Sequence, residues 1–120
     1  MAEHVYDSSD SCTGKNVAQE PLEYSIYSLL KKYQITITTA ESATGGMIAS
    51  TLINVAGISE FFTEGYVTYS NEAKVKMIHV APETIDTYGV VSSETAADMA
   101  ASAAKTAATM AAVSVTGVAG

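Results

Sequence analysis

The sequence predicts an α/β fold in which helices alternate with the strands of a largely parallel sheet. Residues 35–39 are β-branched throughout, and residues 66–69 and 111–115 also have the composition of strands. Between these segments, apolar residues recur three and four positions apart, which is the spacing of amphipathic helices. Since parallel strands are normally connected through helices, the alternation favours a parallel arrangement.

The first half of the chain is expected to hold two helices around the strand at 35–39. Pro21 suits the first position of a helix, where its missing N–H breaks no hydrogen bond, and Lys31 and Lys32 suit the negative end of that helix. A second helix follows the segment TTAESATGG, and Gly57 is placed to end it. Its apolar stripe consists of Met47, Ile48, Thr51, Leu52 and Val55.

Three more helices are expected in the second half. Ser70 can cap a short helix after the strand at 66–69, and a helix or turn at Pro82–Tyr88 ends at Gly89. Either Ser92 or Ser93 begins the longest helix, which leads into the strand at 111–115. The inner face of that helix is expected to consist of Ala96, Met99, Ala103, Ala107 and Met110.

Composition excludes several classes of function. A chain of 120 residues suits a single domain, and its net charge of −7 argues against a nucleic-acid partner, which requires a basic face. Its six cationic side chains are all lysine. A bound phosphate would therefore depend on lysine or on backbone N–H groups, because the bidentate guanidinium fork of arginine is missing.

Residues 1–19 are polar and lack periodicity, so we expect a disordered leader before a domain that spans residues 20–120. The leader has no apolar block typical of a secretory signal, and no segment is apolar enough to span a bilayer. These features predict a cytoplasmic protein without a membrane partner. Cys12 is the only cysteine, and neither His4 nor His79 is expected to bind a metal.

Two expected strand-to-helix junctions carry polar groups that can cooperate. At the first, Ser42 precedes a helix that Thr44 can cap, and the N–H groups of residues 43–46 are expected to point outward with partial positive charge. Gly45 and Gly46 allow a ligand to approach this backbone closely. Such a turn can stabilise an oxyanion or a phosphate.

At the second junction, Tyr69 ends a strand and Lys74 lies one turn into the next helix. A lysine at the positive end of a helix, if desolvated, has a lowered pKa and becomes a base that can activate a serine. The same residues also have plainer interpretations: Ser42 as a loop residue, Lys74 as a solvated side chain and Tyr69 as packing. Glu41 is either an active-site acid or an acceptor for nearby backbone N–H groups.

Four blocks of sequence, AESATGG, GYVTYSNEAKVKMI, GVVSSETA and VSVTGVAG, occur in the order found in one family. Over residues 22–120 the chain resembles the CinA C-terminal domain family, whose active members are nicotinamide-nucleotide amidohydrolases. The resemblance implies a three-layer α/β/α sandwich with a mostly parallel mixed sheet. Members of the family continue beyond the TGVAG segment, so we expect this chain to lack the family's C-terminal segment.

The resemblance also implies a reaction and a set of site residues. Family members convert nicotinamide mononucleotide and water to nicotinate mononucleotide and ammonia, without a cofactor or metal. By resemblance, Ser42 is the nucleophile, Lys74 is the base and Tyr69 assists them. The residues expected to contact the substrate are Glu41, Ala43, Thr44, Gly45, Gly46, Asn71, Thr116 and Gly117.

Two functions remain open from the sequence. The first is deamidation of nicotinamide mononucleotide in pyridine-nucleotide salvage. The second is a catalytically inactive nucleotide-binding or regulatory module with the same fold, since some relatives have the fold without turnover. In either case the resemblance implies a homo-oligomer that binds a small pyridine nucleotide.

Overall fold

A computed structural model of the chain describes residues 20–118. The leader expected at residues 1–19 lies outside the described residues. The elements, in chain order, are α2 (Leu22–Tyr33), β1 (Ile37–Glu41), α3 (Met47–Leu52), the 3₁₀ helix η1 (Ile58–Glu60), β2 (Gly65–Val67), α4 (Asn71–Ile78), α5 (Pro82–Tyr88), α6 (Ser93–Ala107) and β3 (Ala111–Val115).

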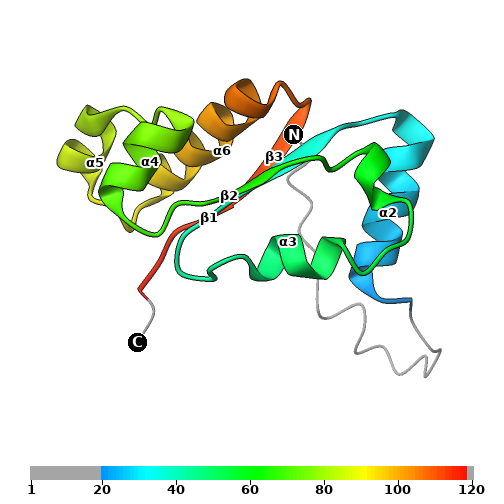
Figure 1. The fold of residues 1–120 in the computed structure, drawn as a ribbon. Coiled ribbons are helices and arrows are strands. Elements are labelled where there is room, and N and C mark those ends of the chain that lie inside the picture. The colour runs from blue at the N-terminus through cyan, green and yellow to red at the C-terminus, as the bar shows by residue number, and fades with distance from the viewer. Residues whose placement is uncertain (1–19, 119–120) are drawn as a thin grey trace.

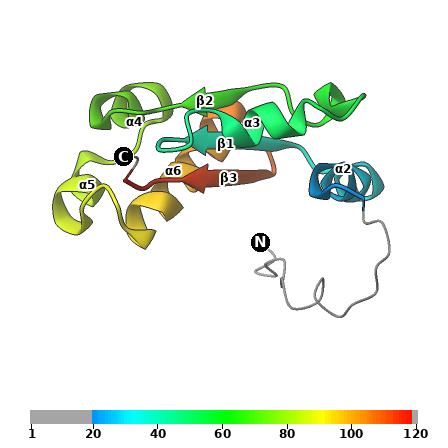
Figure 2. The ribbon, with the colours of Figure 1, turned by 90° about the horizontal axis from the view of Figure 1, so that it is seen from below.

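The three strands form one sheet in the order β2-β1-β3, and both pairings are parallel. Helices cover both faces: α4, α5 and α6 lie on one side, and α2 and α3 lie on the other (Figures 1 and 2). The predicted three-layer α/β/α architecture is therefore confirmed. The sheet is wholly parallel over residues 20–118, so the antiparallel strand expected of a mixed sheet is not among its members.

Each face of the sheet has its own apolar core. The larger core joins α2, α3 and η1 to the sheet, and its buried members are Leu30, Ile37, Leu52, Val55, Ile58, Phe61 and Phe62. The core on the other face joins α4 and α6 to β1 through Ala40, Ile78, Val80, Met99 and Ala103. Because β1 is central, its five residues are all buried. Among the described residues, no helix is both long enough and apolar enough to cross a bilayer.

Strand β1 lies two residues later than the sequence predicts. Ile35 lies in the turn that closes the end of α2, because its N–H donates to the carbonyl of Leu30 at 2.9 Å and the cap residue Gln34 adopts a left-handed conformation. Pairing with β3 then begins at Ile37 and continues to Glu41, which is opposite Val115. The shift places Glu41 inside the sheet instead of in a loop.

Two predicted helix boundaries also differ from the structure. Helix α3 ends at Leu52, and Gly57, with φ +92°, precedes η1 instead of ending α3. Helix α6 ends before the left-handed Ala108, so Met110 lies outside the helix and is 71% exposed instead of packing on its inner face. Strand β2 ends at Val67, two residues before Tyr69.

The serine that caps α6 is Ser92, and this assignment can be tested by substitution. Its Oγ accepts a hydrogen bond from the N–H of Thr95 at 3.1 Å, whereas the side chain of Ser93 bonds only to the adjacent Glu94. Ser92→Ala is expected to lower the free energy of unfolding by about 1 kcal/mol. Ser93→Ala is expected to change it by less than about 0.5 kcal/mol. Urea unfolding of both variants measures the difference, and equal losses would contradict the assignment.

Candidate active site

The structure brings Ser42 and Lys74 together although they are 32 positions apart in sequence. The Nζ of Lys74 donates to the Oγ of Ser42 at 3.1 Å. Ser42 directly follows β1, and Lys74 lies one turn into α4, which follows β2. Because β1 and β2 are parallel neighbours, their carboxyl ends meet at one edge of the sheet, where α/β proteins commonly build sites.

The amine of Lys74 is buried among neutral acceptors. The residue is 1% exposed, and its Nζ also donates to the carbonyl of Thr68 at 2.9 Å and, more weakly, to that of Ser70 at 3.5 Å. No carboxylate is among these three partners. Burial lowers the pKa of Lys74, which favours the neutral amine. A neutral amine can take the hydroxyl proton of Ser42 across the same 3.1 Å contact.

The turn that follows Ser42 depends on two glycines. Gly45 and Gly46 have φ values of +61° and +112°, a range in which side chains with a Cβ are strained. The Gly45 N–H donates to the carbonyl of Ser42 at 3.0 Å and closes the turn. On its other side, the N–H of Ser42 donates to the carbonyl of Val115 on β3 at 3.0 Å.

Glu41 holds this turn against α3. Its Oε1 accepts from the N–H of Ile48 at 2.8 Å and from the Oγ1 of Thr44 at 2.7 Å, and its Oε2 accepts from the N–H of Ala49 at 2.9 Å. Burial alone would raise the pKa of Glu41, but these hydrogen bonds, together with the N–H of Gly46, hold its pKa below the usual value. Glu41 is 0% exposed, so a substrate contact is at odds with this geometry.

The prediction that Thr44 caps α3 is wrong. The residue at the cap position is Gly46, which has no side chain that could bond to the helix. The Thr44 hydroxyl instead donates to the Glu41 carboxylate. The Glu41 carboxylate caps the helix instead, although Glu41 lies seven residues before Ile48 in the sequence. The physical reason is that a carboxylate at the end of a buried strand can reach two N–H groups of the helix that packs on it.

Only part of the expected row of backbone donors is open. The Gly45 N–H is used within the turn, and the Gly46 N–H contributes to lowering the pKa of the Glu41 carboxyl. The N–H groups of Ala43 and Thr44 make no hydrogen bond to residues 20–118. These two donors follow Ser42 directly, which suits an oxyanion that forms on the oxygen of a carbonyl group attacked by the serine.

The TGVAG segment reaches the same turn from β3. A Cβ placed on Gly117 would lie 3.8 Å from the Cβ of Ala43, so the two backbones are close. Thr116 does not point its hydroxyl toward Ser42; its Oγ1 donates to the carbonyl of Val90 at 2.8 Å and ties β3 to the segment before α6. Gly117 therefore borders the turn, whereas Thr116 connects the end of β3 with the segment before α6.

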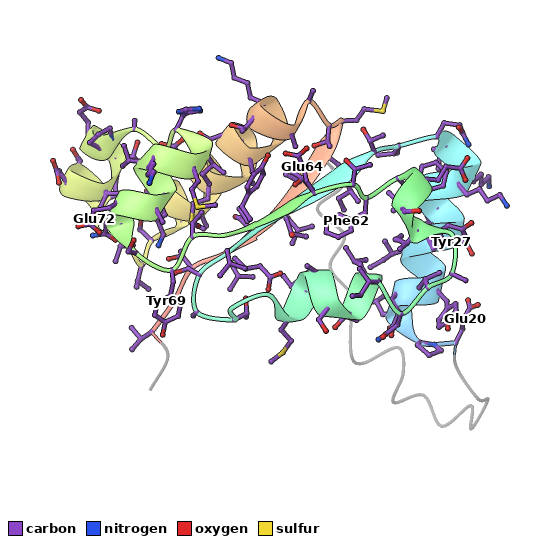
Figure 3. The ribbon with its side chains drawn as sticks, in the orientation of Figure 1. Glu20, Tyr27, Phe62, Glu64, Tyr69 and Glu72 are labelled. Carbon is purple, nitrogen blue, oxygen red and sulfur yellow. The ribbon has the colours of Figure 1, made fainter. Side chains whose placement is uncertain are left out.

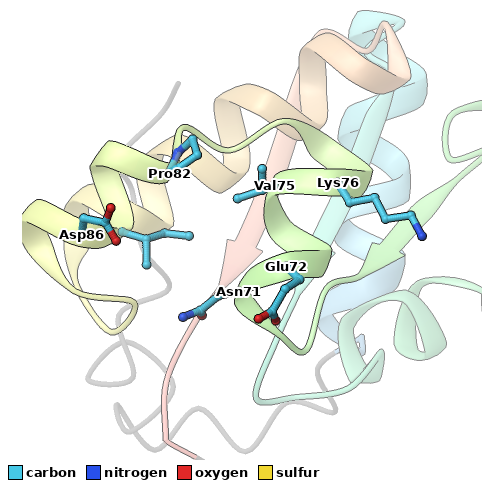
Figure 4. A pocket seen from close by; sticks show the side chains of 7 residues that line it. Asn71, Glu72, Val75, Lys76, Pro82 and Asp86 are labelled. Atoms are coloured by element: carbon cyan, nitrogen blue, oxygen red, sulfur yellow. The ribbon is translucent and has the colours of Figure 1, made fainter.

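Two predicted site residues, Tyr69 and Asn71, make no side-chain hydrogen bond to Ser42 or Lys74 among the described residues. Tyr69 is 63% exposed where β2 leads into α4 (Figure 3), and its hydroxyl bonds to neither Ser42 nor Lys74. Asn71 faces a pocket of about 390 Å³ between α4 and α5 (Figure 4). That pocket is lined by Asn71, Glu72, Val75, Lys76, Pro82, Ile85 and Asp86, and so excludes the reactive pair.

Comparison with known proteins places this architecture in a family. The family model described as the CinA C-terminal domain matches residues 19–120. The chain belongs to the CinA C-terminal domain family. It is similar to a CinA-like protein of Kosmotoga olearia, with 52% identity over 104 residues, and to a CinA-like protein of Chloroherpeton thalassium, with 50% identity over 100 residues. These matches cover 87% and 83% of this chain but only 25% and 24% of the two relatives.

Solved CinA structures show the same fold. The competence/damage inducible protein CihA of Agrobacterium tumefaciens superposes with a TM-score of 0.75 at 42% identity, over 82% of this chain and 60% of that one. A CinA superfamily protein of Escherichia coli superposes with a TM-score of 0.76 at 31% identity, over 86% and 63% of the two chains. The chain thus spans about 60% of the solved CinA domains and about a quarter of the curated relatives.

One contributor to this CinA site was not predicted from the sequence. Thr68 is 0% exposed, and its carbonyl is the nearest acceptor of the Lys74 amine. A threonine at a strand end gives no distinctive pattern, and only its burial next to a lysine reveals the role. In the part of the CinA chain that is described, no three His, Cys, Asp or Glu side chains gather in a way that could hold a metal ion.

Proposed function

We propose that this CinA-family chain carries the catalytic centre of an amidohydrolase that converts nicotinamide mononucleotide and water to nicotinate mononucleotide and ammonia. The observation that supports the chemistry is the 3.1 Å contact between the Ser42 hydroxyl and the buried amine of Lys74. Serine with lysine is a known variant of the serine–base pair. The choice of substrate rests on the resemblance to active members of the family.

In this proposal, the Oγ of Ser42 attacks the carboxamide carbon while its proton passes to the neutral Nζ of Lys74. The carbonyl oxygen becomes an oxyanion, which the free N–H groups of Ala43 and Thr44 stabilise. Collapse of this intermediate breaks the carbon–nitrogen bond, and the Lys74 ammonium returns the proton to the departing ammonia. Water then attacks the acyl-enzyme and gives a proton to Lys74, which passes it to the Oγ of Ser42 as the ester bond breaks. The nicotinic acid group is released and ionises to the carboxylate.

Tyr69 has a smaller part in the proposal than the family resemblance implies. Since its exposed side chain bonds to neither member of the pair, proton transfer is assigned to Lys74 alone. Tyr69 and Gly117, which lie on the two neighbouring segments, are proposed to border the bound substrate.

The direct test is incubation of the 120-residue chain with nicotinamide mononucleotide. We expect equal amounts of ammonia and nicotinate mononucleotide, measured by a coupled glutamate dehydrogenase assay and by liquid chromatography. Calorimetry on the same preparation distinguishes the alternative: saturable nucleotide binding with no ammonia would identify an inactive binding module. If the preparation shows neither nucleotide binding nor ammonia release, both functions are refuted.

A further inference from the structure

We propose that Glu41 is a positioning residue, whose buried carboxylate holds the turn at residues 42–46 so that the Ser42 hydroxyl faces Lys74. The inference rests on the proposed Ser42–Lys74 chemistry and adds to it. Glu41 does not touch the reacting atoms. It acts through the backbone on either side of the nucleophile.

The Glu41 carboxylate reaches donors on both sides of the two glycines. Its two oxygens accept from Thr44, Ile48 and Ala49, at 2.7, 2.8 and 2.9 Å. These donors lie before and after the two glycines, whose backbone is otherwise free to adopt many conformations. Fixing donors on both sides of the glycines restricts the turn that carries Ser42.

The backbone of Glu41 connects the nucleophile with the base. Its carbonyl accepts from the N–H of Thr68 at 2.8 Å, and the Thr68 carbonyl in turn accepts from the Nζ of Lys74 at 2.9 Å. The next residue along the chain is Ser42, whose N–H is held by Val115 at 3.0 Å. Glu41 thus connects the serine turn with the backbone that holds the lysine amine.

Only a carboxylate satisfies this set of donors. Both of its oxygens accept, whereas an amide of the same shape would place an N–H₂ group against the N–H of Ile48 or of Ala49. Such a buried clash leaves donors unpaired and shifts the turn. A displacement of about 1 Å at a reacting atom can reduce a rate by about 100-fold.

The test uses a fluorophosphonate probe, which reports on the serine without any nucleotide. The Oγ of Ser42 forms a bond to phosphorus, fluoride leaves, and the hydroxyl proton passes to Lys74. Glu41→Gln is expected to lower the rate constant of labelling by about 10- to 100-fold. The final extent is expected to stay at one label per folded chain. Loss of stability alone would instead lower the extent and leave the rate constant unchanged.

Two further variants keep the result clear if Glu41→Gln folds poorly. Thr44→Val removes one of the hydrogen bonds to the carboxylate, and we expect a rate constant that is lower by a few-fold. Thr51→Ala is the matched control on α3, since the Thr51 hydroxyl bonds only to Met47, and it should label at the parental rate. Parental rates in both Glu41→Gln and Thr44→Val would overturn the positioning role alone. An unlabelled Ser42 in the parent would overturn the proposed chemistry and this inference with it.

Discussion

Ser42→Ala is expected to reduce the release of ammonia from nicotinamide mononucleotide by at least about 1,000-fold. The substitution removes the Ser42 hydroxyl oxygen, which contacts the Lys74 amine at 3.1 Å. Without that oxygen, the proposed acyl-enzyme cannot form. Backbone donors and substrate binding remain, which leaves at most a low residual rate. The measurement is the initial rate at saturating substrate, together with mass spectrometry of the chain after quenching, which should detect an acyl adduct only in the parent.

A serine in the same region is the control for this experiment. Ser50 lies on α3, is exposed, and has no side-chain hydrogen bond to the described residues. Ser50→Ala should therefore retain the parental rate. Turnover that survives in Ser42→Ala would remove the serine from the mechanism, whatever the outcome for Ser50.

Lys74→Met is expected to reduce turnover by about 100- to 10,000-fold, which is the usual contribution of a general base. Methionine is the informative replacement because it fills a similar buried volume and removes only the amine. The parental rate should rise with pH as Lys74 loses its proton, and the midpoint of this rise should lie below the ordinary lysine value of 10.5 because burial lowers the pKa. The variant should lose this rise of the rate with pH. If parent and variant show the same rise, a group other than Lys74 is responsible for it.

The same variant is expected to change how the free energy of unfolding depends on pH, in a direction that the pKa shift defines. Burial lowers the pKa of Lys74 in the folded state, so below that pKa the folded chain must hold a desolvated ammonium. This destabilisation is fully present below the folded pKa and disappears as pH rises toward the unfolded value of 10.5. Lys74→Met should therefore gain most stability over the parent at low pH and progressively less toward pH 10.5. Urea unfolding across this range measures the difference.

Local sequence signals predicted much of the fold. Strand β3 was predicted with its observed boundaries, Ser70 was predicted as the cap of α4, and Gly89 was predicted to end α5. Each of these features depends on a few adjacent residues, such as a serine oxygen before a helix or a glycine after one. The proximity of Ser42 and Lys74 was also expected, since it follows from two parallel strands that end at one edge.

Features that depend on packing between distant segments were not predictable in the same way. The sequence allows Glu41 to be either an acid or a backbone acceptor, because its role depends on α3 folding back onto β1. Thr44 fits the sequence pattern of a helix cap, yet its hydroxyl bonds to the carboxylate three residues earlier. The predicted end of β2 at Tyr69 is wrong for a similar reason: β2 ends at Val67, and the backbone then turns before α4 begins.

The central place of β1 in the sheet has a consequence for how the protein matures. One neighbour, β2, fixes Glu41 through Thr68, and the other, β3, fixes the N–H of Ser42 through Val115. During synthesis on the ribosome, Val115 emerges long after Ser42. A nascent chain can therefore pair β1 with β2 before β3 has emerged, but the N–H of Ser42 is held only once β3 docks.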